Sequence, residues 1–235
     1  MAKQSTYKIW EGTNPNGQSI MATLSSVNRP SSNRKTGDMA QLSVLSSHTK
    51  PSAAIKARTD SDFCGTCPLQ AGKGCYVNPI AYNAVHKAAT GLPVTPLPEF
   101  DKPIRLGAYG DPGFIPLPVL KTITANHRWT GYTHQWLTVP PGYSHFLMAS
   151  VDGIRPTESR ANAKRLGYRT FRTLSEGQSP EEGEIMCPNI THNGVSCATC
   201  LLCSGTSHAT AKDICIPAHG SKGKINFINN KNKGS

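Results

Sequence analysis

The chain has 235 residues, eight cysteines and a formal net charge of +11. This length is enough for one sizeable domain with a packed core, so the cysteines are not needed merely to staple a small fold. No run of about 18 apolar residues occurs and no apolar signal segment follows the first residues, so neither a membrane-spanning helix nor secretion is expected. We therefore expect a protein of the reducing cytoplasm, where clustered thiols bind metals more often than they form disulfides.

The positive charge is concentrated at the two ends of the chain. Residues 1–60 carry eight Lys/Arg against three Asp/Glu, and residues 211–235 carry five against one. Basic ends on a near-neutral body are typical of proteins that contact nucleic acid, although the same charges also serve solubility. Lysines interleaved with Gly and Asn over 221–235 predict a disordered basic tail.

The middle of the chain predicts an α/β fold. Residues 1–38 are rich in Ser, Asn, Pro and Gly, so we expect an irregular N-terminal extension with short β-like pieces. The core is expected over 39–175, where the first strand covers 39–45. Further strands are expected over 104–109, 129–136, 145–151 and 168–172, and helices over 79–89, 117–126 and 158–166. Strands that alternate with helices of about ten residues predict parallel βα units forming a partial or complete (β/α) barrel.

A first cysteine group, Cys64, Cys67 and Cys75, lies between the first strand and the first long helix of this core. Structural metal sites are normally closed by four protein ligands, whereas catalytic sites leave one position open for substrate. Three thiolates therefore indicate either an open site or a fourth ligand from elsewhere in the chain. The candidates for that fourth ligand are His86, Cys215 and His219.

Polar residues lie at or near the carboxyl ends of three different predicted strands: Asp111, His134 and Asp152. In a parallel barrel these ends line the active site, so the three are candidate catalytic residues. Asp-Pro-Gly and Asp-Gly sequences also occur in ordinary turns, which is the alternative interpretation of the two aspartates. We expect the first cysteine group to face these side chains.

A second cysteine group lies in the C-terminal segment, 176–220. Cys197, Cys200 and Cys203 are separated by two residues each, and Cys187 precedes them, followed by a proline. Ferredoxin-type 4Fe–4S clusters use a Cys-x2-Cys-x2-Cys run with a Cys-Pro, although there the Cys-Pro follows the run. Four thiolates also form tetrahedral zinc sites. The sequence predicts a metal site in this segment and leaves iron–sulfur and zinc as alternatives.

Three core segments carry a resemblance to known proteins. The sequences at 104–112, 130–136 and 147–152, together with both cysteine groups, resemble a family of cysteine-rich phage and prophage proteins over residues 33–220. The order of these parts is also similar, more distantly, to phage-type radical S-adenosylmethionine proteins. The resemblance implies a cytoplasmic location in an infected bacterial host.

The radical S-adenosylmethionine resemblance also implies cofactors. In that superfamily three cysteines hold a 4Fe–4S cluster whose open iron binds S-adenosylmethionine, and many members add a four-cysteine auxiliary cluster. Carried over, the first cluster is held by Cys64, Cys67 and Cys75, and the second by Cys187, Cys197, Cys200 and Cys203. The cysteine loop departs from the family pattern, because the usual Cys-x3-Cys-x2-Cys spacing is Cys-x2-Cys-x7-Cys here.

The resemblance implies an enzyme that modifies a nucleotide, a nucleic acid or a protein. The alternative is a zinc-stabilised, non-catalytic protein that binds nucleic acid or a host partner. Open three-thiolate coordination and polar strand ends favour the enzyme. The basic termini and the departure in cysteine spacing favour the alternative.

Overall fold

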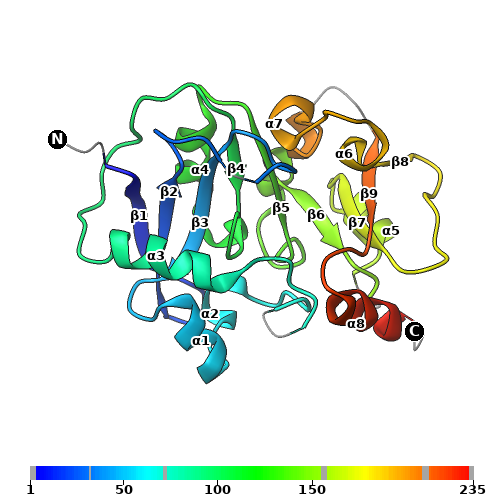
Figure 1. Ribbon diagram of the computed structural model, residues 1–235, viewed down its shortest axis with the longest axis horizontal. Helices are drawn as coiled ribbons and strands as arrows, with labels where there is room; N and C mark the ends of the chain where they lie inside the picture. The colour runs from blue at the N-terminus through cyan, green and yellow to red at the C-terminus, as the bar shows by residue number, and fades with distance from the viewer. Residues whose placement is uncertain (1–3, 32, 71–72, 155–157, 208–211, 233–235) are drawn as a thin grey trace.

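The computed structural model describes residues 4–31, 33–70, 73–154, 158–207 and 212–232 of the chain. Their strands form one nine-stranded sheet in the order β1-β2-β3-β4-β5-β6-β7-β9-β8 (Figure 1). The strands are β1 (Thr6–Thr13), β2 (Ser19–Ser25), β3 (Ala40–Ser46), β4 (Ile104–Leu106), β5 (Trp129–Thr133), β6 (Met148–Val151), β7 (Thr170–Leu174), β8 (Glu184–Met186) and β9 (Asp213–Pro217). The α-helices are α1 (Pro51–Ala57), α2 (Ser61–Cys64), α3 (Pro79–Ala89), α4 (Leu117–Thr124), α5 (Arg160–Arg165), α6 (Pro188–Thr191), α7 (Cys197–Cys200) and α8 (Lys222–Asn232). Short 3-10 helices cover Pro112–Phe114 (η1), Pro141–His145 (η2) and Gly205–Ser207 (η3).

The sheet is mostly parallel and open. Strands β3, β4, β5, β6, β7, β9 and β8 run parallel to their neighbours, whereas β1 and β2 join antiparallel to β3. The predicted α/β class with a parallel core is confirmed. Because β1 and β8 are the two edges of the sheet, the prediction of a complete barrel is wrong.

The N-terminal extension is not irregular. The β-like pieces expected within 1–38 become β1 and β2, and Ile20, Met21 and Leu24 are fully buried in the hydrophobic core. The backbone groups of β2 are hydrogen-bonded on both edges of the strand, to β1 and to β3. This pairing cannot be inferred from the local Ser/Asn-rich sequence. The extension therefore belongs to the core of the domain.

The two faces of the sheet are defined by the register of its strands. Successive side chains point to opposite faces, and Arg105 of β4 is paired with Gln41 of β3 and Thr130 of β5. We call the face that carries these three the front face. Helix α3 packs against β1 and β2, and Figure 1 shows it lying across the sheet in front of β1–β3. Helix α3 begins at Pro79, where the Asn78 side chain accepts a hydrogen bond from Ile80 N.

The opposite face of the C-terminal half is held by buried ion pairs. Asp213 of β9 accepts from Arg160 Nε and Lys164 Nζ of α5, each at 2.9 Å. Arg172 Nε of β7 donates to Glu184 Oε1 of β8 at 2.8 Å. Asp213 and Glu184 are both buried, so these pairs tie α5, β7, β8 and β9 together.

The segment predicted to be a disordered tail forms helix α8 over Lys222–Asn232. Ile228 is fully buried, and a side chain at Gly74 would come within 3.3 Å of the Phe227 ring. The expectation of disorder rested on the lysines and asparagines and missed this apolar pair, which packs onto the first cysteine loop. In the described part of the chain, no helix has the length and apolar character needed to cross a membrane.

Candidate functional site

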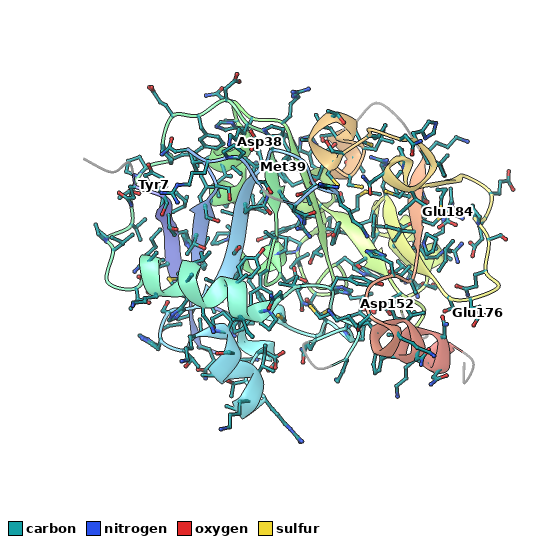
Figure 2. The ribbon with its side chains drawn as sticks, viewed as in Figure 1. Tyr7, Asp38, Met39, Asp152, Glu176 and Glu184 are labelled. Atoms are coloured by element: carbon teal, nitrogen blue, oxygen red, sulfur yellow. The ribbon has the colours of Figure 1, made fainter. Side chains whose placement is uncertain are left out.

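Asp111, His134 and Asp152 lie together at the carboxyl end of β4, β5 and β6. Asp111 Oδ2 accepts a 2.8 Å hydrogen bond from His134 N, and His134 Nδ1 lies 3.7 Å from Asp152 Oδ2. Figure 2 shows Asp152 at the lower, carboxyl end of the parallel strands, whereas Asp38 and Met39 lie at the upper end. Residues from three strands therefore meet at one end of the sheet.

The Asp111 side chain stabilises its own turn as well as contacting the residues at the end of β5. Its side chain caps η1 by accepting from Gly113 N at 2.8 Å, and it also accepts from Thr133 Oγ1 at 2.6 Å. Complete burial raises the pKa of Asp111, and these hydrogen bonds oppose the rise. Since both carboxylate oxygens already accept bonds from the chain, Asp111 positions the ends of β4 and β5, as the turn interpretation anticipated.

Glu158 joins His134 and Asp152 without having been anticipated from the sequence. One ligand atom from each of these three residues lies within 4.8 Å of the other two. Asp152 and Glu158 are 0% and 1% exposed. A carboxylate–carboxylate–imidazole set matches the ligands of divalent transition metals. Glu158 lies in the segment before α5, where no periodicity or motif marks it, so only the fold identifies it.

The first cysteine group is attached to the end of β5. Gln135 Nε2 donates to Cys64 O at 3.3 Å, and Gln135 Oε1 accepts from Thr66 Oγ1 at 3.3 Å. Asp111 N also donates to Phe63 O at 2.7 Å. The loop that carries Cys64 and Cys67 is thus fastened to the same strand ends that carry the polar residues.

The thiols of the first group are near one another and strongly desolvated. Burial raises the pKa of Cys64 and of Cys67 well above the usual range, and neighbouring thiols and Asp111 raise both further. Burial also raises the pKa of Cys75, while Lys224 of α8 and Arg105 of β4 oppose that rise. Thiols in such a setting stay protonated until a metal or another cation compensates the thiolate charge.

The second cysteine group lines a single small cavity. All four of its cysteines face a space of about 20 Å³, together with Thr130 of β5 and Ile214 of β9. Gly131 N donates to Cys203 O at 2.7 Å, and Cys197 N donates to Lys35 O at 3.1 Å. Gly131 lies in the middle of β5 and Lys35 precedes β3, so the second group lies apart from the first, which is held at the carboxyl ends of the strands.

The spacing of the sulfurs differs from that of a mononuclear zinc site. Among the described residues, His134, Asp152 and Glu158 are the only group of three metal-type ligands within 4.8 Å of one another, so no three thiols are that close. Tetrahedral coordination with Zn–S bonds of about 2.3 Å would place sulfurs about 3.8 Å apart. In an iron–sulfur cubane each thiolate binds a different iron, which spreads the sulfurs more widely.

Cations surround the second group. Burial raises the pKa of Cys203 well above its usual range, and burial also raises the pKa of Cys197. Arg169 opposes the rise in the pKa of Cys203, and Arg105 opposes the rise in the pKa of Cys197. Burial also raises the pKa of Cys187, and Lys35 opposes that rise. Nearby positive charges are what a centre bound by four thiolates requires to offset its net negative charge.

The three reserve ligands for the first group have different surroundings. Cys215 is fully buried, and its Sγ donates to Ile185 O on the ion-paired face. His86 is buried on α3, with its ring beside Thr90. His219 stacks on Tyr76, with ring centroids 4.2 Å apart and planes at 4°. Of the three, His219 is the one that contacts the first cysteine loop, by stacking on Tyr76, the residue after Cys75.

Comparison with known proteins gives no relative: no family model, no curated protein and no solved structure matches the chain.

Proposed function

We propose that this protein is an iron–sulfur enzyme of the radical S-adenosylmethionine type, acting on a nucleotide, a nucleic acid or a protein. The observation that carries the proposal is the separation of seven cysteines into two distinct groups on an open parallel sheet. Three thiols stand at the carboxyl ends of the strands near Asp111 and Asp152, and four line one small cavity beside Thr130 and Ile214. The first group would hold an open cluster and the second an auxiliary one.

The donor sets fit iron–sulfur centres. Soft thiolates select iron–sulfur clusters or zinc. Among the described residues no three sulfurs lie within 4.8 Å of one another, so their spacing does not match a mononuclear zinc site. When bound, an open 4Fe–4S cluster would supply one electron to S-adenosylmethionine.

The residues of the chain itself would bind, orient and shield the reactants. Gln135 holds the cysteine loop onto the end of β5 through Cys64 O and Thr66 Oγ1. Asp152 orients the His134 imidazole, so that the pair presents a polar, partly buried surface to a ligand. Helix α8 packs on the loop from below and limits the access of water to Cys75.

A zinc-stabilised, non-catalytic protein that binds nucleic acid or a host partner is the second candidate. The net charge of +11 favours it, as does the Cys-x2-Cys-x7-Cys spacing. It predicts four-coordinate zinc in the second group and no redox-active centre.

The metal content of anaerobically purified protein tests the proposal. We expect brown protein with iron and acid-labile sulfide, and an electron paramagnetic resonance signal after reduction. Cys67→Ala should remove the cluster of the first group only, and Cys200→Ala that of the second only. Cys215→Ala is the matched control and should change neither. Colourless protein with stoichiometric zinc would contradict the proposal and support the second candidate.

A further inference from the structure

A cluster of one arginine and three tyrosines lies on the front face between the two cysteine groups. Arg105 of β4 and Tyr132 of β5 share this face, because Arg105 is paired with Thr130. Tyr82 of α3 and Tyr76 of the first cysteine loop approach the same place, since each lies close to Tyr132. We call Arg105, Tyr132, Tyr82 and Tyr76 the arginine–tyrosine cluster.

Arg105 has no carboxylate partner in the cluster. The guanidinium lies within hydrogen-bonding reach of the Tyr132 hydroxyl, and its other main neighbours are the Tyr82 phenol and the Cys197 thiol. No ion pair joins Arg105 to an acidic side chain of the described residues. A desolvated guanidinium is normally paired with an anion. The arginine is therefore placed to receive an anionic group from outside the chain.

Aromatic rings flank the arginine. Tyr132 stacks on Phe171 of β7, with ring centroids 4.8 Å apart and planes at 13°, and Tyr76 stacks on His219. Each of these four rings is only half-buried. On the other face of β4, Ile104 and Leu106 are 0% and 2% exposed. The front face thus keeps accessible aromatic surface beside a cation at the middle of the sheet.

We propose that the arginine–tyrosine cluster binds one nucleotide unit of the substrate, with its phosphate on Arg105 and its base stacked on one of the half-buried tyrosine rings. A guanidinium binds phosphate through two parallel hydrogen bonds, and every nucleobase offers a face for stacking. The inference rests on the proposed function in one respect, because it takes the cluster as the substrate site beside the first cysteine group. Binding itself needs no radical chemistry.

An acidic peptide satisfies this arrangement less well. Its carboxylate would pair with Arg105, but it has no planar ring to cover the tyrosine and histidine faces. A nucleoside 5′-monophosphate satisfies both the cation and the rings. The source of that unit is either a free nucleotide or a nucleic-acid strand, and binding to the two can be compared directly.

Equilibrium dialysis with the purified full chain, in whatever metal state it is isolated, tests the inference. The probes are the nucleoside 5′-monophosphates, the same nucleosides without phosphate, a short single-stranded oligonucleotide and an acidic peptide. We expect the monophosphates or the oligonucleotide to bind, and the bare nucleosides to bind at least tenfold more weakly. Tighter binding of the oligonucleotide would identify nucleic acid as the source.

Variants separate the role of Arg105 from general charge. Arg105→Gln should weaken binding of the phosphate-bearing probe at least tenfold while leaving nucleoside binding unchanged. Arg128→Gln is the matched control: Arg128 is exposed at the start of β5, and its loss should change binding less than twofold. Tyr132→Leu should weaken both probes by a similar factor. Circular dichroism confirms folding, and Arg105→Lys replaces Arg105→Gln if the latter does not fold.

Two outcomes overturn the inference. Wild-type affinity in both Arg105 variants would do so, as would preferential binding of the acidic peptide. A change in the metal spectrum of Arg105→Gln without loss of nucleotide affinity would make Arg105 a counter-ion of the second cysteine group. Colourless zinc protein that still binds nucleotides through Arg105 would defeat the proposed function and leave this site intact, so the two failures are distinguishable.

Discussion

The two cysteine groups differ in the charged side chains that lie near their thiols. The thiols of the first group have carboxylates near them, Asp60 and Asp111 beside Cys64 and Asp152 beside Cys67. In the second group, cations lie near the thiols. The cations are Lys35, Arg105 and Arg169. Four thiolates make a closed, structural type of centre, whereas the first group, with acids near Cys64 and Cys67 and with Lys224 and Arg105 near Cys75, leaves one coordination position for a ligand.

The same contrast extends to how each group is held. The Gln135 side chain and one backbone hydrogen bond, from Asp111 N to Phe63 O, fasten the first group to the strand ends. The second group is fastened by backbone contacts to β5 and to the segment before β3, and it lines a cavity on the sheet itself. Loss of the second centre should therefore affect the whole fold, and loss of the first should remain local.

The largest expected effect is the loss of the second centre. Cys200→Ala should remove its metal and destabilise the fold by about 3 kcal/mol or more, because metal binding is coupled to folding. This corresponds to a fall in Tm of roughly 6–12 °C for a chain of this size. Cys75→Ala should lose the metal of the first group and any activity, with Tm lowered by less than half as much. Metal analysis and thermal melting measure both, and equal losses of Tm would erase the proposed contrast.

Acid should weaken the region behind the second group selectively. Although burial raises the pKa of Asp213, hydrogen bonds from Thr170 N, Lys164 and Arg160 leave it below its usual value. Its stabilising contribution is therefore present above the unfolded-state pKa of about 4 and is lost as pH falls through the lower folded-state value. The same sign applies to Glu184, because hydrogen bonds from Arg172 lower its pKa.

Asp111 should respond in the opposite sense. Burial raises its pKa, so acidification relieves the desolvation of its carboxylate in the folded state. Urea unfolding at pH 7 and near pH 3 measures the difference. Asp213→Asn should lower stability at pH 7 by about 2 kcal/mol, since the bonds from Arg160 and Lys164 lose their charged acceptor, and should flatten the acid dependence. An unchanged pH dependence in Asp213→Asn would show that other groups control acid unfolding.

The smallest expected effect concerns the geometry of the first cysteine loop. Gly65 has φ of +61°, and a Cβ there would lie 2.4 Å from the Gln135 amide. Gly65→Ala should cost about 1–2 kcal/mol and lower the metal content of the first group, because the Gln135 contact must shift. Gly91→Ala is the matched control, since Gly91 has φ of +79° but no atom within 4 Å. Equal metal content in the two variants would mean that Gln135 does not position the loop.

Local sequence patterns anticipated much of the core of the sheet. The strands expected at 39–45, 104–109 and 129–136 correspond to β3, β4 and β5, because alternating apolar residues must face a core on one side. Helix α3 spans the predicted 79–89, since Pro79 and the Asn78 cap mark its start without help from the rest of the fold. The placement of polar residues after the strands is also a local property.

Other features depended on contacts far apart in the chain. Segments β1 and β2 look irregular alone and become core strands because β3 offers an unpaired edge. Helix α8 has weak helical character in its sequence, and the burial of Ile228 and the packing of Phe227 near Gly74 accompany its docking. Glu158 reaches His134 and Asp152 only because α5 returns along the sheet.

By itself the sequence determined the two cysteine spacings and the polar residues that end three strands. These follow from residue type and local periodicity, which act over a few residues. Only the tertiary structure decided that the two groups are separate sites on one sheet, with Arg105 near Cys75 of the first and Cys197 of the second. Long-range placement depends on strand pairing and burial across the whole chain, which no local pattern encodes.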